Sequence, residues 1–397
     1  STPTLTTGFI ALGNNSGQGT FNQQTATSNT TGSLFIGGQG TYNLDGGTLD
    51  VGTTIGGQGS IVGTSDSGAL LNQTGGTHTT NTLIVGNRSD SSGTYSISGG
   101  DLIVSGQMFV GRGHDSLNSG TLNGLFQQSA GSVDAAQIFV GGFAESATSY
   151  YGAGRYEVSV GTVTSAFTAI GWLGQGSVLQ TAGTFNAGEL QLGSSGLFSV
   201  SNGNGGFDFY SSGTYDLKGG VLNATSTTVS VFGLGTFNQS DGDHNVSGNL
   251  TVGSQPGLIE LNSGQVREGV YKLSGGNLTV VGNVTIGAGN GVNLDPGFPG
   301  EPGALGTFIQ SGGTHVVGGD LKIGQSGNVA GGTGLAPIKA MLRHGLENEA
   351  YEGDMTLYQG ARSREWLYDV ETLSALADEY GQFTYRPCLS EETPEQV

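Results

Sequence analysis

Histidine is the side chain best suited to metal binding at neutral pH, and this chain of 397 residues contains five histidines. Three of them, His78, His244 and His315, fall in the same region of three similar segments. One interpretation is a ladder of metal sites along one face. These segments are far apart in the sequence, so we favour the alternative, in which each histidine is a solvated residue at a turn.

Clustered carboxylates are the other sign of a reactive site. The string Asp241-Gly-Asp243-His244 lacks the further acidic residues of a calcium loop, so we interpret it as a turn. Enzymes that cleave polysaccharides need carboxylates on one face, often beside Arg or Lys. The basic residues before position 326 are instead widely dispersed: Arg88, Arg112, Arg155, Lys218, Arg267, Lys272 and Lys322. We therefore expect no enzyme activity from this part.

The elements that must position these residues are short strands in a 19-residue repeat. Well-aligned copies run over 19–37, 93–111, 235–253, 269–287 and 306–324. In the last copy, Thr307–Gln310, Thr314–Val317 and Leu321–Ile323 alternate with period two between glycine pairs. A fixed period near 20 residues is typical of stacked repeats. The sequence predicts an all-β parallel β-solenoid (β-helix) of about a dozen rungs, with three short strands per rung.

Two kinds of repeat alternate. One kind carries a glutamine near the end of its first strand, and the other carries an aliphatic residue there after a tyrosine, as in Gln239 and Leu273. A buried amide without partners costs about 1–3 kcal/mol, so we expect the glutamines to bond neighbouring rung backbones or to face water. We also predict an aromatic stacking ladder that serves assembly: Phe21, Tyr42, Tyr95, Tyr156, Tyr215, Phe237, Tyr271 and Phe308.

Composition narrows the classes of protein. The chain has 77 glycines, 11% charged residues and a net charge of −19, so nucleic acid and anionic membrane surfaces are not expected partners. It has no apolar run long enough to span a membrane and does not begin with Met. We expect an extracellular or bacterial cell-surface protein whose signal peptide has been removed. Its single cysteine, Cys388, has no internal disulfide partner.

Glycine becomes scarce after about residue 326, which predicts a solenoid domain over 1–325 and a second module over 326–397. The second module alternates helix and strand patterns. We expect helices over about 337–346 and 364–380, and strands over 355–358 and 383–389. This is half of an α/β nucleotide-binding fold, so the fold class includes a small, partial α/β segment at the C-terminal end.

The string Ala330-Gly-Gly-Thr-Gly-Leu-Ala-Pro337, followed by Tyr358-Gln-Gly-Ala-Arg362, resembles the nicotinamide-binding domain of the ferredoxin reductase superfamily. The resemblance is greatest to the reductase components of bacterial oxygenases and covers about 70 residues. It implies that the dinucleotide pyrophosphate approaches the glycine-rich turn, that Thr333 lies near the nicotinamide, and that Arg362 and Ser363 lie near the adenosine ribose. The cofactor-binding residues implied in this way are Gly331, Gly332, Thr333 and Gly334.

The chain lacks that family's Arg-x-Tyr-Ser flavin signature and its Cys-Gly-Pro-Pro segment. We therefore expect a truncated, vestigial site with no cofactor and no redox turnover. NAD(P) would bind only if the segment is functional.

The repeats resemble the β-helical repeats of bacterial autotransporter passengers and related exported surface proteins, over about 320 residues. The leading hypothesis is a structural protein, not an enzyme, whose rods self-associate into extracellular fibres or a surface layer. One alternative is a monomeric adhesin, or a rod that binds cell-surface glycans through aromatic loop residues, namely Phe207, Phe209, Tyr210 and Phe298. The other is an NAD(P)H-dependent flavin reductase fragment in the C-terminal module.

Overall fold

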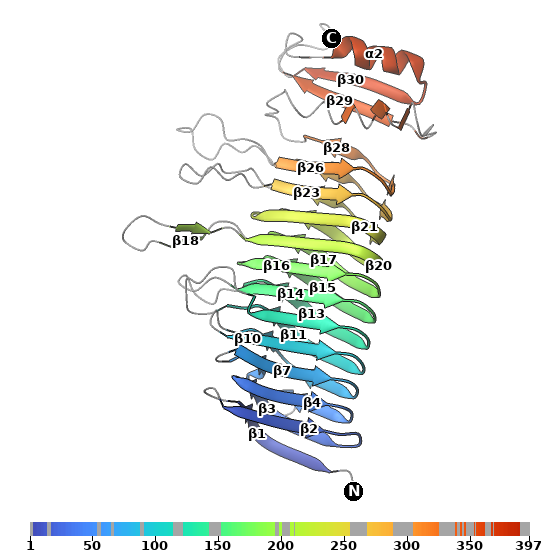
Figure 1. Ribbon diagram of the computed structural model, residues 1–397. Coiled ribbons are helices and arrows are strands. Elements are labelled where there is room, and N and C mark those ends of the chain that lie inside the picture. The colour runs from blue at the N-terminus through green and yellow to red at the C-terminus, as the bar shows by residue number, and fades with distance from the viewer. Residues whose placement is uncertain are drawn as a thin grey trace. The chain divides into compact units, whose positions relative to one another are not determined.

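The structure is a computed structural model. It describes residues 3–13, 17–53, 57–64, 67–87, 91–113, 122–142, 152–194, 198–200, 207–209, 211–254, 268–288, 305–324, 338–339, 342–343, 345–346, 353, 355–361, 367 and 369–389. The chain forms two compact units, Ser1–Gln325 and Ser326–Val397. The first unit is mostly β, and 26 of its strands form one large parallel sheet (Figure 1). The predictions of a mostly β chain and of parallel pairing are confirmed.

The strands of the first unit pair with strands one repeat further along the chain. A first line of parallel pairs joins the strands that begin each repeat. These are β2 (Gln18–Gln23), β4 (Gln39–Leu44), β7 (Ser67–Gln73), β10 (Ser92–Ile97), β12 (Gly124–Gln128), β14 (Ala153–Val158), β16 (Gln175–Gln180), the starts of β20 (Ser212–Val229) and β21 (Leu234–Val246), β23 (Glu268–Leu273) and β26 (Leu305–Gln310).

Two further lines contain the second and third strand segments of each repeat. In several repeats these two segments form one continuous strand. The members are β1 (Thr4–Leu12), β3 (Ser28–Ile36), β5 (Thr48–Val51), β6 (Gly59–Val62), β8 (Thr77–Thr80), β9 (Leu83–Val85), β11 (Asp101–Val110), β13 (Ser132–Val140), β15 (Thr162–Ile170), β17 (Thr184–Leu192), the later parts of β20 and β21, β22 (Leu250–Val252), β24 (Asn277–Val280), β25 (Val284–Ile286), β27 (Thr314–Val317) and β28 (Leu321–Ile323). We use the term rung for one first, one second and one third strand segment that follow one another in the chain.

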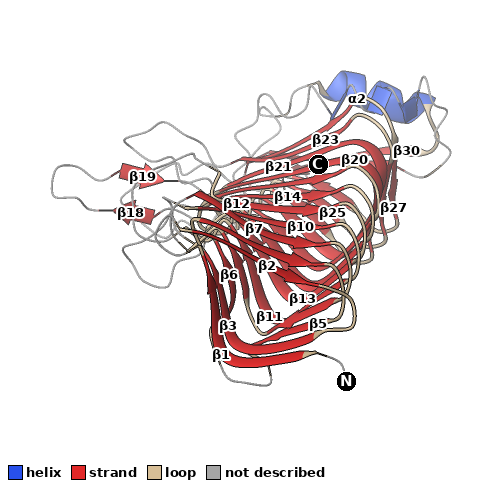
Figure 2. Cartoon of the chain, turned by 60° about the horizontal axis from the view of Figure 1, so that its bottom comes forward, coloured by secondary structure: helices blue, strands red, loops and turns tan. Residues whose placement is uncertain are grey.

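Figure 2 shows the rungs lying side by side. Two further strands form an antiparallel hairpin outside the stack, β18 (Phe198–Val200) and β19 (Phe207–Phe209). The side chains of Phe207 and Phe209 lie outside the described residues, as do Tyr210 and Phe298. The structure therefore does not test these four residues as recognition groups.

Glycine is required at the corner between the first and second segments. Gly76 and Gly100 occupy equivalent corners in successive rungs, both with positive φ (71° and 81°). A Cβ atom added to Gly100 would lie 2.2 Å from the carbonyl oxygen of Gly76. Only glycine fits this left-handed backbone and this close approach between rungs. The high glycine content is thus a consequence of stacking tight corners on one another.

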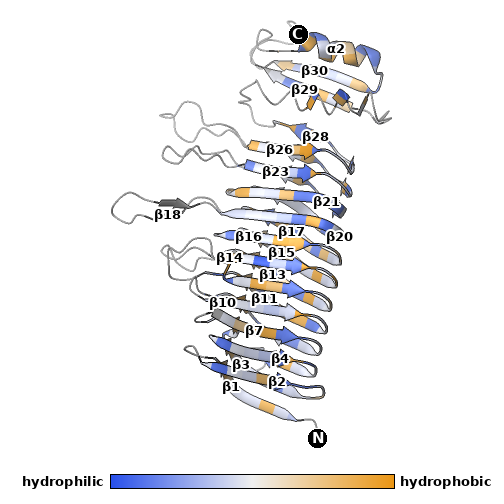
Figure 3. Ribbon diagram, in the orientation of Figure 1, coloured by the Kyte–Doolittle hydropathy of each residue, from blue (hydrophilic) through white to orange (hydrophobic). Residues whose placement is uncertain are grey.

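The core of the first unit lies between the three lines of strands. Inward residues alternate with outward ones, as in the burial pattern of β14, where Gly154, Tyr156 and Val158 are buried and the residues between them are not. Figure 3 shows hydrophobic and hydrophilic residues interleaved along the strands in this way. Each rung buries only a few side chains, so the hydrophobic core becomes continuous only when the rungs stack.

The second unit contains β29 (Met355–Ala361), α2 (Val370–Glu379) and β30 (Phe383–Leu389). The two strands pair in parallel, with Met355 opposite Phe383 and Gly360 opposite Cys388. The helix packs Leu373 and Leu376 onto Leu357 and Phe383. The helix was expected from about residue 364 but begins at Val370, because Asp369 has a left-handed backbone (φ 62°) that helical geometry does not allow.

Candidate functional site

Glutamine and tyrosine side chains connect successive rungs inside the core. The Tyr271 hydroxyl donates to Oε1 of Gln239 in the preceding rung (2.7 Å). Nε2 of Gln239 donates to two backbone carbonyls, one at Gly242 in its own corner (3.0 Å) and one at Asn277 in the next rung (2.9 Å). The same arrangement recurs at Gln23, Gln73, Gln128 and Gln180, all of them buried. The expectation that the amides bond neighbouring rung backbones is confirmed.

This bonding gives the physical reason for the alternation of two kinds of repeat. A glutamine rung offers an acceptor, and the following tyrosine rung supplies the hydroxyl that fills it. Burial raises the pKa of Tyr95, Tyr156, Tyr215 and Tyr271 well above the ordinary value of 10, so each hydroxyl keeps its proton and remains a donor. Donors and acceptors in the core are therefore balanced in pairs of rungs.

The eight predicted stacking aromatics lie within the core of the first unit. Phe21 stacks on Tyr42 with 5.0 Å between ring centroids, and Tyr215, Phe237, Tyr271 and Phe308 form a run with spacings of 5.1, 4.6 and 5.0 Å. Two members of this aromatic column were not predicted. Phe126 lies between Tyr95 and Tyr156, and Phe185 from a second-segment strand lies between Tyr156 and Tyr215.

The aromatic column is interrupted between Tyr42 and Tyr95, where Leu71 occupies the register position. All five tyrosines of the column have no exposed surface. The contacts that these aromatics make are between rungs of the same chain. Phe126 could have been found from its third place in the segment Gly124-Leu-Phe126, which keeps the glycine of the repeat but not its threonine.

His78 and His244 are not solvated turn residues, so the sequence interpretation is wrong for these two, and His315 lies partly buried in β27. His78 and His244 have no exposed surface, and burial lowers the pKa of each to about 3. His244 lies with its Nε2 3.1 Å from the Thr227 hydroxyl and its Nδ1 2.9 Å from the Tyr271 hydroxyl. Within the described residues no group of three or more His, Cys, Asp or Glu side chains could hold a metal ion. The ring is a neutral member of the core network.

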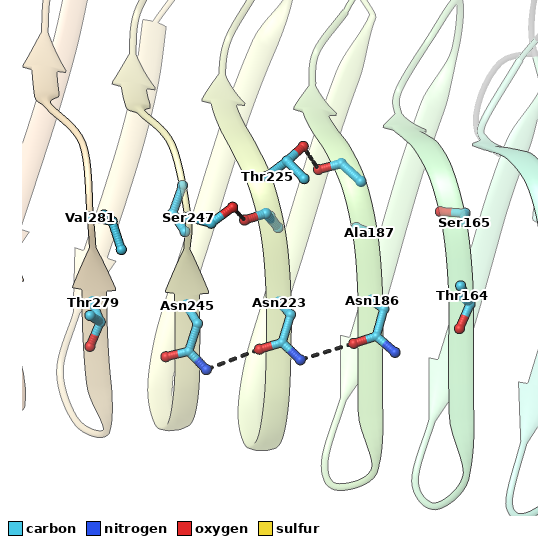
Figure 4. A pocket seen from close by; sticks show the side chains of 13 residues that line it. Thr164, Ser165, Asn186, Ala187, Asn223, Thr225, Asn245, Ser247, Thr279 and Val281 are labelled. Atoms are coloured by element: carbon cyan, nitrogen blue, oxygen red, sulfur yellow. Dashed lines mark hydrogen bonds between the residues drawn. The ribbon is translucent and has the colours of Figure 1, made fainter.

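A shallow groove of about 380 Å³ crosses five rungs on the outside of the first unit (Figure 4). An amide ladder runs along it: Asn245 donates to Asn223, which donates to Asn186, with distances of 3.0 and 2.9 Å. Thr164 and Thr279 occupy the register positions beyond its two ends. The residues that line the groove carry no charge, and most of the amide hydrogen-bonding groups are used by one another. The ladder connects rungs as the glutamines do inside.

The second unit has the geometry of a strand, a crossover helix and a parallel strand. In such a βαβ unit, ligands bind beyond the carboxyl ends of the strands. Here those ends bring Gly360 of β29 beside Cys388 of β30. Among the described residues no atom lies within 4 Å of a Cβ built on Gly360, which is exposed. The sequence-predicted residues Gly331, Gly332, Thr333 and Gly334, together with Arg362 and Ser363, lie outside the described residues.

One ion pair connects the segment after the glycine-rich turn to the start of α2. Lys339, which is helical, donates to Oδ2 of Asp369 at 2.7 Å, and the Thr372 hydroxyl donates to Oδ1 at 3.0 Å. These hydrogen bonds hold the pKa of Asp369 below its ordinary value. Ile338 and Leu342 pack against the same apolar cluster as α2. The chain that follows the glycine-rich turn is therefore anchored to the βαβ unit at both polar and apolar contacts.

Comparison with known proteins identifies this segment. Residues 329–396 match the oxidoreductase NAD-binding domain family. The chain is 44% identical over 66 residues to the xylene/toluene monooxygenase electron transfer component of Pseudomonas putida, which is 16% of this chain and 19% of that protein. It is 39% identical over 62 residues to the ferredoxin–NAD(P)(+) reductase component of the naphthalene 1,2-dioxygenase system of Pseudomonas putida, again 16% and 19%.

The segment is a C-terminal NAD-binding oxidoreductase domain with relatives of the ferredoxin reductase type. A further relative is the reductase component of the propane 2-monooxygenase of Gordonia sp. (strain TY-5), 31% identical over 65 residues, which are 16% of this chain and 18% of that protein. The chain thus spans about a fifth of the length of the curated relatives it matches. No solved structure matches the chain.

These matches overturn the leading functional hypothesis. The chain was expected to be a structural fibre or surface-layer protein or an adhesin, to have no enzyme activity and to take no cofactor. The match to an NAD-binding family and to reductases contradicts all of these expectations. The error came from taking the missing Arg-x-Tyr-Ser and Cys-Gly-Pro-Pro motifs as loss of the site. The repeats occupy most of the chain but follow a degenerate pattern. The short Gly-Gly-Thr-Gly-Leu-Ala-Pro string is specific for a dinucleotide-binding turn and carries more information about function.

In the described residues no helix has the length and apolar character needed to cross a membrane.

Proposed function

We propose that residues 326–397 bind NAD(P)H and that the protein is an electron-transfer oxidoreductase of the ferredoxin reductase type. The observation that carries the proposal is the family match over residues 329–396. The parallel β29 and β30, joined through α2, supply the strand edge at which a dinucleotide binds in such folds. When bound, NAD(P)H supplies a hydride. The acceptor we propose is a flavin, which takes up the hydride and one proton from water while the nicotinamide is oxidised.

The chain's own residues have three roles in this proposal. The glycines of the turn, Gly331, Gly332 and Gly334, would let the backbone approach the pyrophosphate, and Thr333 would meet the nicotinamide, as the resemblance implies. Gly360 leaves open the carboxyl end of β29, where the adenosine half would pass. The ion pair between Lys339 and Asp369 fixes the segment that follows the turn against the βαβ unit.

Titration of the full chain with NADH and NADPH by isothermal calorimetry tests the binding step. We expect saturable binding of one of them, and we expect Gly332→Val to weaken it at least tenfold by filling the space next to the pyrophosphate. Gly360→Val should weaken binding at the strand edge in the same way. Gly381→Ala is the matched control, because nothing lies within 4 Å of its added Cβ and it is in the turn between α2 and β30. Absence of saturable binding by the unaltered chain refutes the proposal.

The hydride step has a separate readout. With FAD added, we expect the loss of NADH absorbance at 340 nm to depend on both the flavin and the intact turn. If NADH binds but FAD does not increase its oxidation, the segment is a dinucleotide-binding domain and the proposed flavin acceptor is contradicted.

We propose further that residues 1–325 form a β-solenoid with three strand segments per rung. The support is the constant one-rung offset of every parallel pair, from β1 with β3 to β25 with β28. Circular dichroism of the full chain should then show dominant β structure, and a largely helical spectrum would contradict it.

A further inference from the structure

The starting point is an arrangement in the core that binds one tyrosine hydroxyl from two sides. Tyr271 donates its proton to Oε1 of Gln239 (2.7 Å), and Nδ1 of His244 lies 2.9 Å from the same hydroxyl. A hydroxyl has one proton, so the ring must donate from Nδ1 to the Tyr271 oxygen. The other ring nitrogen accepts from the Thr227 hydroxyl. Gln239 and His244 belong to one rung, and Tyr271 belongs to the next.

A second copy of this arrangement occurs much earlier in the chain. The Tyr95 hydroxyl donates to Oε1 of Gln73 at 2.7 Å and lies 2.9 Å from Nδ1 of His78. Nε2 of His78 contacts the Ser60 hydroxyl at 2.9 Å. In both copies the glutamine precedes the histidine by five residues. A glutamine and a histidine at this spacing therefore form a receptor for a tyrosine of the following rung.

A third pair with the same spacing, Gln310 and His315, lies in the last described rung. Nε2 of Gln310 donates to the Gly313 carbonyl in its own corner (3.2 Å), as the internal glutamines do. Over the part of the chain that the structure describes, no hydrogen bond joins the Gln310 carbonyl oxygen or Nδ1 of His315 to a following rung. Nε2 of His315, which in the internal copies meets a hydroxyl of the preceding rung, is buried without a partner. The pair is a tyrosine receptor without its tyrosine.

The strand edge around Gln310 and His315 also has the features of a surface that a further rung would cover. Within the described residues, β26, β27 and β28 each pair on one side only, with β23, β24 and β25. Large apolar side chains on this edge are 40–50% exposed: Leu305, Ile309, Val316 and Leu321. Phe308 offers the ring on which the next aromatic would stack, as Tyr271 stacks on Phe237 at 4.6 Å. Open strand edges with exposed apolar residues recruit further strands.

We propose that the edge formed by Leu305–Ile323 binds a β-strand segment of a partner polypeptide that carries a tyrosine-type repeat, Gly-x-Tyr-x-aliphatic. The segment adds one parallel rung, and its tyrosine hydroxyl donates to Gln310 and accepts from His315. The backbone of the segment supplies a carbonyl that accepts the second Nε2 proton of Gln310. In the internal copies the corresponding carbonyls of the following rung are Asp101, for Gln73, and Asn277, for Gln239.

Two sources within the same protein fit less well. The segment that follows in the chain, 325–337, contains no tyrosine. A second copy of the chain would present Phe21 as its first aromatic residue in the column, and phenylalanine has no hydroxyl for Gln310 and His315. A tyrosine-bearing repeat from another polypeptide supplies a hydroxyl for the Gln310 carbonyl oxygen and for Nδ1 of His315.

The test uses the full chain and a fluorescein-labelled synthetic peptide of residues 268–287, EGVYKLSGGNLTVVGNVTIG, which is the rung that fills the internal Gln239 and His244 pair. Fluorescence anisotropy should show saturable binding. A peptide with Tyr271→Phe should bind about tenfold more weakly, because two hydrogen bonds to the hydroxyl are lost. A peptide of scrambled order is the composition control.

The chain variant Gln310→Leu provides the matched second arm, since leucine occupies this register position in the neighbouring rung at Leu273. Against this variant, the advantage of the tyrosine peptide over the phenylalanine peptide should fall well below the tenfold expected with the unaltered chain, because only the bond to His315 remains. The proposal is overturned if neither peptide binds or if the unaltered chain binds both equally. It is also overturned if the chain alone forms concentration-dependent oligomers that the peptide dissociates, because a second copy is then the occupant. The phenylalanine peptide keeps the test decisive should Gln310→Leu fold poorly.

Discussion

Replacing Gln239 with leucine tests whether the polar network in the core stabilises the stack of rungs. Leucine is the residue at the equivalent position of both neighbouring rungs, Leu217 and Leu273, so the side chain fits the space and the strand register. The substitution removes the acceptor of the Tyr271 hydroxyl and the donor to two backbone carbonyls. The Tyr271 hydroxyl then loses its amide acceptor, and it can donate to Nδ1 of His244 only if the ring changes tautomer and no longer accepts from the Thr227 hydroxyl. One hydroxyl of the network therefore loses its acceptor in either case.

The expected cost follows from these groups. A buried polar group left unpaired costs about 1–3 kcal/mol, and the two carbonyls add less because the corner and strand backbones still bond them in part. We expect Gln239→Leu to lower the free energy of unfolding by about 2–4 kcal/mol. Adding Tyr271→Phe should recover about 1 kcal/mol, since it removes the unpaired hydroxyl.

Urea denaturation followed by circular dichroism gives the stability of the first unit, and native-state hydrogen exchange locates the change. We expect faster exchange in the rungs from Leu234 to Leu273 and little change near β2 and β4. A Gln239→Leu variant as stable as the unaltered chain would refute the reasoning, because an all-apolar core would then serve equally well. Additive effects of the two substitutions would show that Gln239 and Tyr271 are not energetically coupled.

Three further predictions concern pH and backbone geometry. The lowered pKa values of His78 and His244 mean that the unfolded chain binds more protons than the folded chain below about pH 6.5. The stabilisation is therefore complete above about pH 6.5 and is lost as the pH falls toward 3. In acid titrations followed by circular dichroism, His244→Leu should reduce the dependence of the unfolding free energy on pH by up to about 1.4 kcal/mol per pH unit. Gly100→Ala should destabilise by more than about 1 kcal/mol in thermal melts, because the new Cβ meets the Gly76 oxygen, whereas Gly8→Ala, with open space around it, should change stability by less than about 0.5 kcal/mol. The lowered pKa of Asp369 means that its ionised carboxylate stabilises the second unit at pH values above the ordinary carboxyl range, and this stabilisation is lost as the pH falls through the pKa of the folded state. Asp369→Asn should therefore increase hydrogen exchange at the start of α2 at neutral pH. At strongly acid pH the variant and the unaltered chain should not differ.

Much of the strand layout could be predicted from the repeat. The strands expected at Thr314–Val317 and Leu321–Ile323 are observed with those bounds as β27 and β28. The reason is local: period-two alternation and glycine pairs specify strands and corners without reference to distant residues. The same local reasoning predicted β30 at Phe383–Leu389, but it placed the start of the preceding helix about six residues too early. The left-handed backbone of Asp369 has no clear signal in an otherwise helical pattern.

The functional assignment depended on a short string and not on the long repeat. The glycine-rich turn at 331–334 pointed to a dinucleotide, yet the expectation of a vestigial site was drawn from motifs that the chain lacks. The family match corrected that expectation. The residues of the turn lie outside the described part of the structure, so their contacts with a dinucleotide stay a prediction.

By itself, the sequence determined the repeat, the parallel strands, the alternation of glutamine and tyrosine rungs and the chemistry of the C-terminal turn, because these depend on residue type and spacing. Only the tertiary structure decided which groups meet. The burial of His78 and His244 depends on hydroxyls from the preceding rung and tyrosines from the next, and nothing near them in the sequence reveals it. The inclusion of Phe185 in the aromatic column likewise depends on one strand line reaching across the core to another. Side-chain hydrogen bonds between rungs join residues 13 to 41 positions apart, and only stacking brings them within bonding distance.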